Sequence, residues 1–368
     1  MIVKEINLYN FRNYKNQKIK FNDKINIIYG NNAQGKTNIL EGIYLFSLGK
    51  SNRAQKDVEM INFDEETAEV NINFLSKERD FSGKIKFDRK KRKKIFLNEI
   101  PIKRNSDLVG NLNVVFFGPE YLSLIREGPK NRRRNIDIMI SQMKVKYMNL
   151  LSDYKKIIEQ KNVILKEDFK DKILLSVLNE RILELSEYII KTRFEYIKKI
   201  EKIAQKIQLE ISDGKENLKI DYISCGLNID ENKIEILKDI LKKKSEEMFL
   251  KEEKYRECIF GPHRDDFEFK INGQNLKLFG SQGQQKTAVL VQKIAEVELF
   301  NEEKGEYPIL LLDDIMSELD SLRQDLILNK LQNMQIFITC TDVEKFKIME
   351  TANFIKIEKG SMAECICI

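Results

Sequence analysis

Apolar residues recur along the chain with two different periods, and these periods divide it into strand-rich and helix-rich regions. From residue 2 to residue 29, and again from residue 68 to residue 98, apolar and polar residues alternate, which predicts half-buried β-strands. Residues 130–260 contain no proline and only two glycines, and their apolar residues repeat at helical spacing. The pattern predicts a mainly helical insert in a chain that is otherwise rich in strands.

Within this insert the periodicity separates three helices from one strand. Helical spacing runs through 136–165 and 173–207, and a charged helix is predicted for 233–255. Residues 218–224 predict a strand instead. We expect the insert to be chiefly a structural arm, because it is far too short to form a long coiled coil.

Short continuous apolar runs predict a second kind of strand, buried on both faces and typical of parallel sheets covered by helices. They are found at 25–29, 114–117, 308–312 and 335–339, and a strand at 354–358 is expected at the edge of the sheet. We therefore predict an α/β fold in which residues 1–129 and 257–368 form a head and residues 130–256 are inserted between its two parts.

Composition narrows the class of protein. The 368 residues are 42% hydrophobic and 33% charged, which is enough apolar material for a large core and more charge than average. The start of the chain lacks the apolar stretch of a signal peptide, and no run approaches the length of a membrane helix. Five cysteines without the spacing of a zinc site or a disulfide framework favour a reduced, cytoplasmic protein.

The segment between the run at 25–29 and a predicted helix at 38–48 has the spacing of a phosphate-binding loop: a glycine, four residues, then Gly-Lys-Thr. Its glycines let successive main-chain N–H groups point inward, and the start of the helix adds its positive dipole end. Lys36 can reach the β- and γ-phosphates, and the Thr37 hydroxyl can bind Mg²⁺. The predicted nucleotide-binding residues of this loop are Gly30, Asn31, Asn32, Ala33, Gln34, Gly35, Lys36, Thr37 and Asn38.

Two carboxylates follow the apolar run at 308–312. Ligands of α/β proteins gather at the carboxyl ends of parallel strands, so Asp313 and Asp314 are expected near the nucleotide. We predict that Asp313 holds the metal ion through water, with Thr37 as the other metal ligand, and that Asp314 positions or deprotonates the attacking water. The alternative is that the two acidic residues merely open a loop.

A second anion-binding segment is predicted before the helix that runs from about residue 286 through residue 300. A serine and a glycine ahead of a helix can bind an anion, although a simple helix cap has the same sequence. Together with the phosphate loop, this segment predicts nucleotide contacts by Ser281, Gly283 and Gln284.

Positive charge is concentrated in one predicted hairpin. Residues 84–104 carry ten basic and two acidic residues, a local charge of +8 against +6 for the whole chain. Six consecutive cations repel one another, so contact with a phosphate backbone explains them better than a solvated face. An arginine triplet at a predicted helix start is poorly placed for the helix dipole and indicates an anionic partner, either nucleic acid or acidic side chains. The predicted DNA-binding residues are Arg89, Lys90, Lys91, Arg92, Lys93, Lys94, Arg132 and Arg133.

Three further residues have more than one possible role. Arg12, at a predicted turn, either packs with a solvated charge or contacts adenine or DNA. Arg53, just beyond the first helix, is able to reach a phosphate or DNA. His263 is the only histidine and has no nucleophile motif beside it, so we expect a turn residue near the nucleotide rather than a catalytic group.

The order of these motifs resembles that of ABC-type P-loop ATPase heads: phosphate loop, Ser-x-Gly-Gln, apolar strand ending in acids, then Ser-x-Leu-Asp. Within that group the chain is similar to the RecF family of bacterial recombination mediators over nearly its full length. The segments that carry the resemblance are 9–14, 30–38, 118–120, 261–266, 281–285 and 310–320.

The resemblance implies an ATP-dependent homodimer. Two heads would enclose two ATP molecules with Mg²⁺, each bound by the phosphate loop of one subunit and by 281–285 of the other, with Asp320 at the dimer contact and Arg53 as a nucleotide or DNA sensor. Weak ATP hydrolysis would release the clamp. The dimer would bind duplex DNA near single-strand gaps and work with RecR, and indirectly with RecO, to help load RecA, in the cytoplasm at the nucleoid.

The chain departs from ABC transporters at two points. Residues 339–342 stand where transporters carry a switch histidine, and the pair Asp313-Asp314 replaces their Asp-Glu. The shorter second side chain should hold water less well, which suits slow hydrolysis. No glutamine clearly marks a glutamine loop near 118–120. A transporter subunit remains an alternative, as does a small-molecule kinase or GTPase, although no guanine-recognition motif is present.

Overall fold

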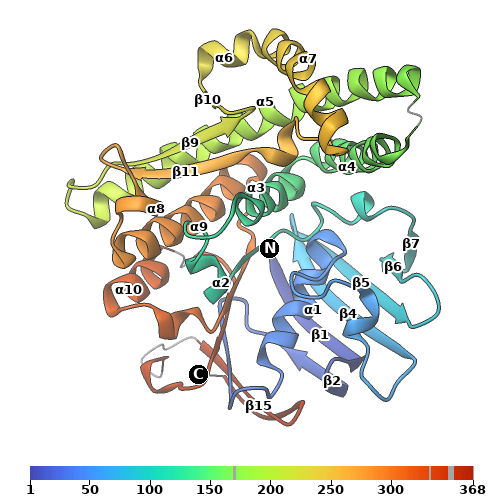
Figure 1. The fold of residues 1–368 in the computed structure, drawn as a ribbon. Coiled ribbons are helices and arrows are strands. Elements are labelled where there is room, and N and C mark those ends of the chain that lie inside the picture. Colours follow the sequence, from blue (N-terminus) through green and yellow to red (C-terminus); the bar gives the residue numbers. More distant parts are fainter. Residues whose placement is uncertain (169–170, 331–332, 347–351, 368) are drawn as a thin grey trace. The chain divides into compact units, whose positions relative to one another are not determined.

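The computed structural model describes residues 1–168, 171–330, 333–346 and 352–367, and the chain forms two compact units (Figure 1). Unit 1 comprises Met1–Tyr121 and Glu296–Ile368, and unit 2 comprises Leu122–Ala295. The segment 257–295, which we grouped with the head, falls in unit 2 by this division. The functional boundaries at residues 129/130 and 256/257 stay predictions.

The first sheet of unit 1 is antiparallel, with strand order β2-β1-β4-β5-β6-β7. Alternate residues of its central strands are buried, as the period of two predicts; in β4 these are Ala68, Val70, Ile72 and Phe74. The strands are β1 Ile2–Phe11, β2 Tyr14–Lys20, β4 Thr67–Ser76, β5 Arg79–Asp88, β6 Lys94–Leu97 and β7 Ile100–Ile102. Two short 3-10 helices, η1 Asp57–Met60 and η2 Asn105–Asp107, accompany them.

The second sheet of unit 1 has the order β16-β15-β3-β14-β13-β8, and every neighbouring pair except β15 with β16 is parallel. The four continuous apolar runs are strands of this sheet, as predicted, and β13 and β14 are buried along almost their whole length. The strands are β3 Ile25–Tyr29, β8 Val114–Phe117, β13 Ile309–Asp313, β14 Ile336–Cys340, β15 Ala352–Glu358 and β16 Ser361–Cys367.

One strand of this sheet was predicted in the wrong place. The strand expected at an edge, β15, lies between β3 and β16. Lys359 and Gly360 both have positive φ, at 50° and 71°, which is the turn that folds one strand directly back on another. This turn brings β16 alongside β15 and makes β16 the edge.

Helix α1, Lys36–Leu48, is buried on nearly every side. Its apolar residues Ile39, Leu40, Ile43 and Phe46 belong to one core cluster with residues of both sheets. The helix that begins at the phosphate loop is therefore fixed by the main core of unit 1. Unit 1 also contains α2 Pro119–Leu122, which crosses the unit boundary, η4 Ile315–Glu318, α10 Ser321–Lys330 and η5 Glu344–Phe346.

Unit 2 combines long helices with a four-stranded sheet of order β10-β9-β11-β12. The predicted helix at 136–165 is two helices, because Lys144 has an extended backbone (φ −127°, ψ 97°), and the helix at 233–255 is interrupted at Ile236. The strand predicted at 218–224 is confirmed as β9. The elements are α3 Pro129–Met143, α4 Val145–Lys166, α5 Lys172–Ile211, β9 Leu218–Ser224, β10 Leu227–Ile229, α6 Glu231–Glu235, α7 Leu237–Tyr255, η3 Pro262–Arg264, β11 Asp266–Ile271, β12 Gln274–Asn275, α8 Leu276–Phe279 and α9 Gln282–Lys304, whose end belongs to unit 1.

None of the described helices combines the length and the apolar character that crossing a membrane requires.

Candidate nucleotide-binding site

The phosphate loop connects β3 to α1 inside unit 1. Gly35, the residue before the helix, has φ +113°, and a Cβ there would lie 2.9 Å from the hydroxyl oxygen of Tyr14. That hydroxyl instead donates a hydrogen bond of 3.1 Å to the Gly35 carbonyl. The loop geometry therefore needs glycine at this position and is supported by a residue from β2.

Lys36 is buried, with only 4% of its surface exposed. Its Nζ donates to the carbonyl oxygens of Gly30 at 2.8 Å and Asn31 at 3.2 Å. Both acceptors belong to the loop itself, so the ammonium group lies within the curl of the loop. This is the place where a lysine would contact the β- and γ-phosphates of a nucleotide.

The carboxyl end of β13 lies beside the start of α1. Asp313 accepts hydrogen bonds from the hydroxyls of Thr37 and Thr339, each at 2.8 Å. Thr339 ends the paired run of β13 with β14, which explains why it lies next to Asp313. The sequence predicted the proximity of Thr37 and Asp313; it did not predict Thr339.

These oxygens also suit the ion that the sequence predicts. Mg²⁺ binds hard oxygen ligands, commonly one or two from the protein with the rest from phosphates and water. Thr37 and Asp313 supply a hydroxyl and a carboxylate oxygen that already approach to 2.8 Å. The pair fits Mg²⁺ in the presence of a nucleotide.

The charge of Arg53, a residue singled out in the sequence, acts on the carboxyl group of Asp313. Burial raises the pKa of the Asp313 carboxyl, while the hydrogen bonds from Thr339 and Thr37 and the charge of Arg53 act in the opposite direction. Arg53 Nη1 also lies 3.4 Å from Asn38 Oδ1, a long contact at the end of the phosphate loop. The structure thus places Arg53 close to both parts of the site.

Asp314 has a left-handed backbone, with φ +50°. Its N–H donates to the Thr339 hydroxyl at 2.8 Å, and its carbonyl accepts from Ser317 Oγ at 2.8 Å. These bonds fix the backbone of Asp314 and leave its carboxylate only partly buried beside Asp313.

A contact that the sequence did not predict closes the other side of the loop. The Gly360 N–H donates to the Gln34 carbonyl at 3.2 Å, and the Lys359 N–H donates to Gln34 Oε1 at 2.5 Å. A Cβ on Gly360 would lie 2.3 Å from the Asn13 carbonyl oxygen. The sequence analysis did not predict that the turn at Lys359 and Gly360 lies on the phosphate loop.

The second predicted nucleotide segment lies in unit 2, at the start of α9. Ser281 Oγ accepts from the Gln284 N–H at 3.2 Å, and Gln284 Oε1 accepts from the Ser281 N–H at 3.0 Å. This is a capping box, the alternative that the sequence left open. Gln284 also donates to Glu216 at 2.9 Å, so its side chain is held within unit 2. Gly283 lies in the first turn of α9.

Asp320 caps α10. Its Oδ1 accepts from the Arg323 N–H at 3.0 Å, and its other oxygen pairs with the Arg323 guanidinium. A role in dimer contact stays a prediction.

Part of the predicted DNA-binding set is available on the surface. The six consecutive basic residues lie where β5 turns into β6, as the alternation predicted. Lys90 pairs with Glu66 at 3.4 Å and Lys93 with Asp57 at 2.9 Å. Arg89 donates to main-chain carbonyls, which include that of Glu65 at 2.8 Å. Within the described chain, Lys91, Arg92 and Lys94 are exposed and form no ion pair.

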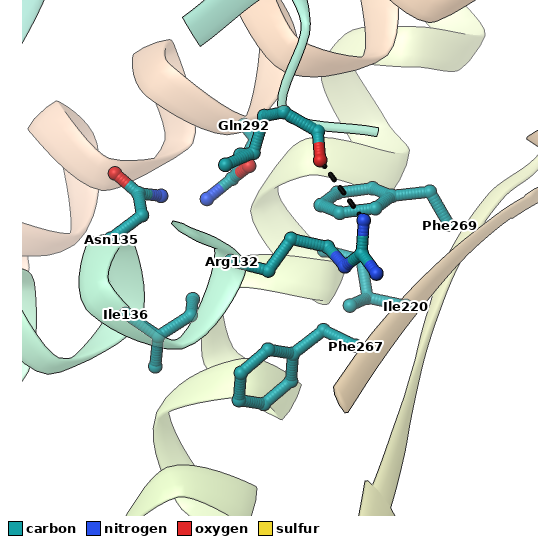
Figure 2. Close-up of a pocket in the computed structure, with 8 residues that line it drawn as sticks. Arg132, Asn135, Ile136, Ile220, Phe267, Phe269 and Gln292 are labelled. Carbon is teal, nitrogen blue, oxygen red and sulfur yellow. Dashed lines mark hydrogen bonds between the residues drawn. The ribbon is translucent and has the colours of Figure 1, made fainter. Parts of the chain in front are cut away.

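The prediction that Arg132 binds DNA is wrong. Arg132 is 4% exposed, and its Nε and Nη2 donate to the two carboxylate oxygens of Asp266 at 2.7 and 2.9 Å. Its Nη1 donates to carbonyls of the preceding turn, which include that of Leu124 at 3.1 Å, and Figure 2 marks one such bond. In the same view its side chain lies beside a small pocket with Phe267 and Phe269 of β11 (Figure 2). The arginine at this helix start therefore meets an acid of its own unit.

Arg133 is half-buried and donates to the Asp265 carbonyl. Burial lowers the pKa of its guanidinium, and the nearby charge of Arg193 adds to that shift. A contact of Arg133 with DNA stays a prediction.

His263 is held by polar partners in unit 2. Its Nδ1 lies 2.6 Å from the Tyr154 hydroxyl and its Nε2 lies 2.9 Å from the Cys258 carbonyl. A carbonyl can only accept, so Nε2 carries the proton and Nδ1 accepts from Tyr154. Burial lowers the pKa of His263 to about 4, so the ring is neutral.

Comparison with known proteins agrees with this geometry. A family model described as "RecF/RecN/SMC N terminal domain" matches residues 2–363. The DNA replication and repair protein RecF of Acetivibrio thermocellus is 43% identical over 98% of this chain and 99% of its own length. The protein of the same name from Clostridium tetani is 41% identical, with 100% of both chains covered.

Solved structures give the same result. The recombination mediator protein RecF-ATP in the RecFOR pathway matches with a TM-score of 0.90 at 36% identity, covering 100% of this chain and 97% of its own. A second structure, RecF-ATPrS, has the same TM-score at 37% identity and covers 98% and 97%. The Smc head domain of Pyrococcus furiosus shares the fold, with a TM-score of 0.56 at 18% identity. The family match over nearly the whole chain, on a head of the ABC ATPase fold, shows that this chain belongs to the RecF family of DNA replication and repair proteins.

Proposed function

We propose that the chain is an ATP-switched DNA-binding protein of recombinational repair and replication, which dimerises around bound ATP and holds duplex DNA near single-strand gaps. The observation that carries the proposal is the meeting of Lys36 and Thr37, at the start of α1, with Asp313, at the end of β13. Relatives solved as RecF-ATP and RecF-ATPrS support ATP as the nucleotide.

Each residue of the site has a separate role in nucleotide binding and hydrolysis. The main-chain N–H groups of the phosphate loop and the Lys36 ammonium bind the phosphates, and Thr37 and Asp313 hold Mg²⁺. When bound, Mg²⁺ neutralises charge on the phosphate oxygens. Asp314 orients a water molecule towards the terminal phosphate from its fixed backbone position. Its short side chain makes the hydrolysis slow, which suits a binding switch better than a fast enzyme.

The second half of each site would come from a second copy of the chain. Ser281, Gly283 and Gln284 open the 23-residue helix α9, whose positive dipole end suits a phosphate. The capping box engages both the side chains and the N–H groups of Ser281 and Gln284, so a nucleotide bound here would replace these bonds. Asp320 would lie at the same contact. ATP thereby acts as the link between two subunits, and hydrolysis releases them.

DNA binding is assigned to the exposed residues of the basic hairpin. A cluster of cations binds the phosphate backbone without selecting a sequence. The family relationship supports RecR as a partner, with RecO and RecA connected indirectly, and a cytoplasmic, nucleoid-associated protein. A transporter subunit is disfavoured because Thr339, at the position of the switch histidine, is engaged by Asp313 and the Asp314 N–H.

The experiment that tests this function is a titration of the protein against gapped and intact duplexes, with and without ATP and Mg²⁺, at several salt concentrations. We expect ATP to strengthen binding and the gapped duplex to bind more tightly. Equal affinities in all four arms would contradict the proposal.

A further inference from the structure

A continuous set of hydrogen bonds in unit 1 joins the nucleotide site to the basic hairpin, and its centre is a buried carboxylate. The Glu41 side chain, in α1 just after the phosphate loop, is 0% exposed. Arg12 donates to both of its oxygens, from Nε at 2.8 Å and from Nη2 at 2.7 Å. Ser51 Oγ donates to the same carboxylate.

On one side of Glu41 the bonds lead to Arg53. Ser51 Oγ accepts from the N–H groups of Arg53 at 2.9 Å and Ala54 at 2.8 Å. The main chain that carries Arg53 is therefore fixed by the hydroxyl that Glu41 holds. The guanidinium of Arg53 lies at the end of the phosphate loop, 3.4 Å from Asn38 Oδ1.

On the other side of Glu41 the bonds lead to η1. Arg12 Nη1 donates to the Glu59 carbonyl at 2.7 Å, and the Arg12 N–H donates to the Met60 carbonyl at 2.8 Å. One residue thus binds α1 through its side chain and η1 through both its side chain and its main chain.

The η1 region in turn holds the basic hairpin at two points. Lys93 pairs with Asp57, the first residue of η1, at 2.9 Å. Arg89 donates to the carbonyls of Asn62 at 3.1 Å and Phe63 at 3.2 Å, just after η1. Both ends of the hairpin tip are therefore anchored on the segment that Arg12 holds.

Two features of Arg12 lower the stability of the fold, which a purely structural residue would not explain. Its φ is +55°, which the two-residue turn between β1 and β2 requires and which glycine would adopt more readily than arginine. It also neutralises a fully buried carboxylate, where well-packed apolar residues would often be at least as stable. Such features persist where geometry matters for function.

We propose that Arg12, Glu41 and Ser51 form a positioning relay through which nucleotide at the phosphate loop alters the DNA-binding hairpin of the same subunit. The relay rests on the proposed function and adds a route of regulation to it. A triphosphate attracts the Arg53 guanidinium. Because Ser51 holds the Arg53 main chain and Glu41 holds Ser51, the displacement reaches Arg12 and, through it, η1 and the hairpin.

The test compares Ser51→Ala and Arg12→Lys with the parent protein and with Lys18→Gln as a control. Lys18 forms an exposed ion pair with Glu5 at 3.0 Å and touches no member of the relay. Ser51→Ala removes a single hydroxyl, so the fold survives; Arg12→Lys keeps the charge but loses the two-oxygen grip on Glu41. For each protein we measure the affinity for ATP, the DNA affinity with and without ATP, and amide hydrogen exchange over residues 51–66.

In the parent and the control, ATP should change DNA affinity by about 5- to 150-fold, the usual range of coupling between sites, and should slow exchange at residues 51–66. In both relay variants the DNA affinities with and without ATP should converge to within about threefold, the exchange response should vanish, and ATP affinity should change much less than the coupling. Variants that keep the parent's response would overturn the relay and leave the proposed function intact. A parent without any response to ATP would overturn both.

Discussion

At Asp314 the charge of the side chain can be removed without changing the backbone conformation. Its left-handed φ of +50° is tolerated by asparagine as well as by aspartate, so the amide can replace the acid without straining the turn. The N–H bond to Thr339 also survives this change, because it uses the main chain.

We therefore predict that Asp314→Asn keeps ATP binding and slows turnover, by about 10²–10⁴-fold if the carboxylate acts as a general base. Phosphate release and nucleotide affinity should be measured on the same preparation. An unchanged release rate would remove Asp314 from the reaction and leave Asp313 as the one functional carboxylate.

His263 can be tested by comparing the pH dependence of the protein with that of a variant, because it is the only histidine in the sequence. Burial lowers its pKa to about 4, below the value of about 6.5 in an unfolded chain. The unfolded state thus takes up the proton first, and the free energy of unfolding falls as the pH drops from about 6.5 towards 4. The expected slope is about 1.4 kcal/mol per pH unit.

We expect His263→Gln to lack this slope. Urea unfolding of both proteins between pH 7 and 5 measures it, since most carboxylates stay ionised over that interval. The variant can be less stable at every pH without affecting the test, because only the difference in slope counts. Parallel pH dependences would show that the pKa of the ring is the same in the folded and the unfolded protein.

The sequence could identify those site residues whose roles follow from a short motif or from the end of a recognisable strand. Lys36 and Thr37 belong to one continuous motif, and Asp313 ends a recognisable strand. Glu41, Arg12 and Gly360 gain their meaning from contacts across tens to hundreds of positions, which spacing cannot reveal. The error at Arg132 has the same origin, because its partner Asp266 is 134 residues away.

Among the elements, the hairpin between β5 and β6 combines two kinds of basic residue. Arg89, Lys90 and Lys93 are engaged by acids or carbonyls of the neighbouring segment 57–66. Lys91, Arg92 and Lys94 form no ion pair within the part of the chain that the structure describes. A continuous run of cations in the sequence is therefore two groups in space, one that contacts the segment 57–66 and one that faces solvent without an ion pair to any described residue.

If the solvent-facing group binds phosphates, changing Lys91, Arg92 and Lys94 together to Gln should weaken DNA binding at every sequence. The slope of log affinity against log salt should fall by up to about 3, at about 0.9 per lost contact. The matched control is the pair Lys90→Gln and Lys93→Gln, which should flatten the slope less. A slope equal to that of the parent in the triple variant would place the DNA elsewhere.

The position of a strand could be predicted where its own apolar pattern shows how it is buried. It could not be predicted where it depends on which strand pairs beside it. The apolar runs of β3, β8, β13 and β14 are explained by burial on both faces. By contrast, β15 has the same kind of run, yet its place inside the sheet depends on β16, whose Ser361-Met362-Ala363-Glu364 carries little apolar pattern. The strand β11 was not predicted from the sequence.

For the whole molecule, the two halves of the proposed nucleotide site lie in different units. The phosphate loop and the carboxylates belong to unit 1, and the capping box at the start of α9 belongs to unit 2. A dimer would unite the loop of one copy with α9 of the other.

The variant that tests dimerisation is Lys36→Met, which removes the ammonium from the phosphate loop while preserving an unbranched side chain. We expect it to remain a folded monomer and to give no ATP-dependent dimer in sedimentation velocity. Asp314→Asn serves as the control, because it should bind ATP and dimerise more persistently than the parent. ATP-dependent dimers of Lys36→Met would contradict the assignment of this loop.

The neighbours of β3 have a consequence for biosynthesis. This strand leads into the phosphate loop, yet it pairs with β14 and β15, which the ribosome makes more than 300 residues later. Throughout translation of the helical segment, the nascent chain exposes a short apolar strand with both edges unpaired, the condition in which chaperones are most needed. A message truncated before the final strands would therefore yield a polypeptide that carries the complete nucleotide motif and cannot use it.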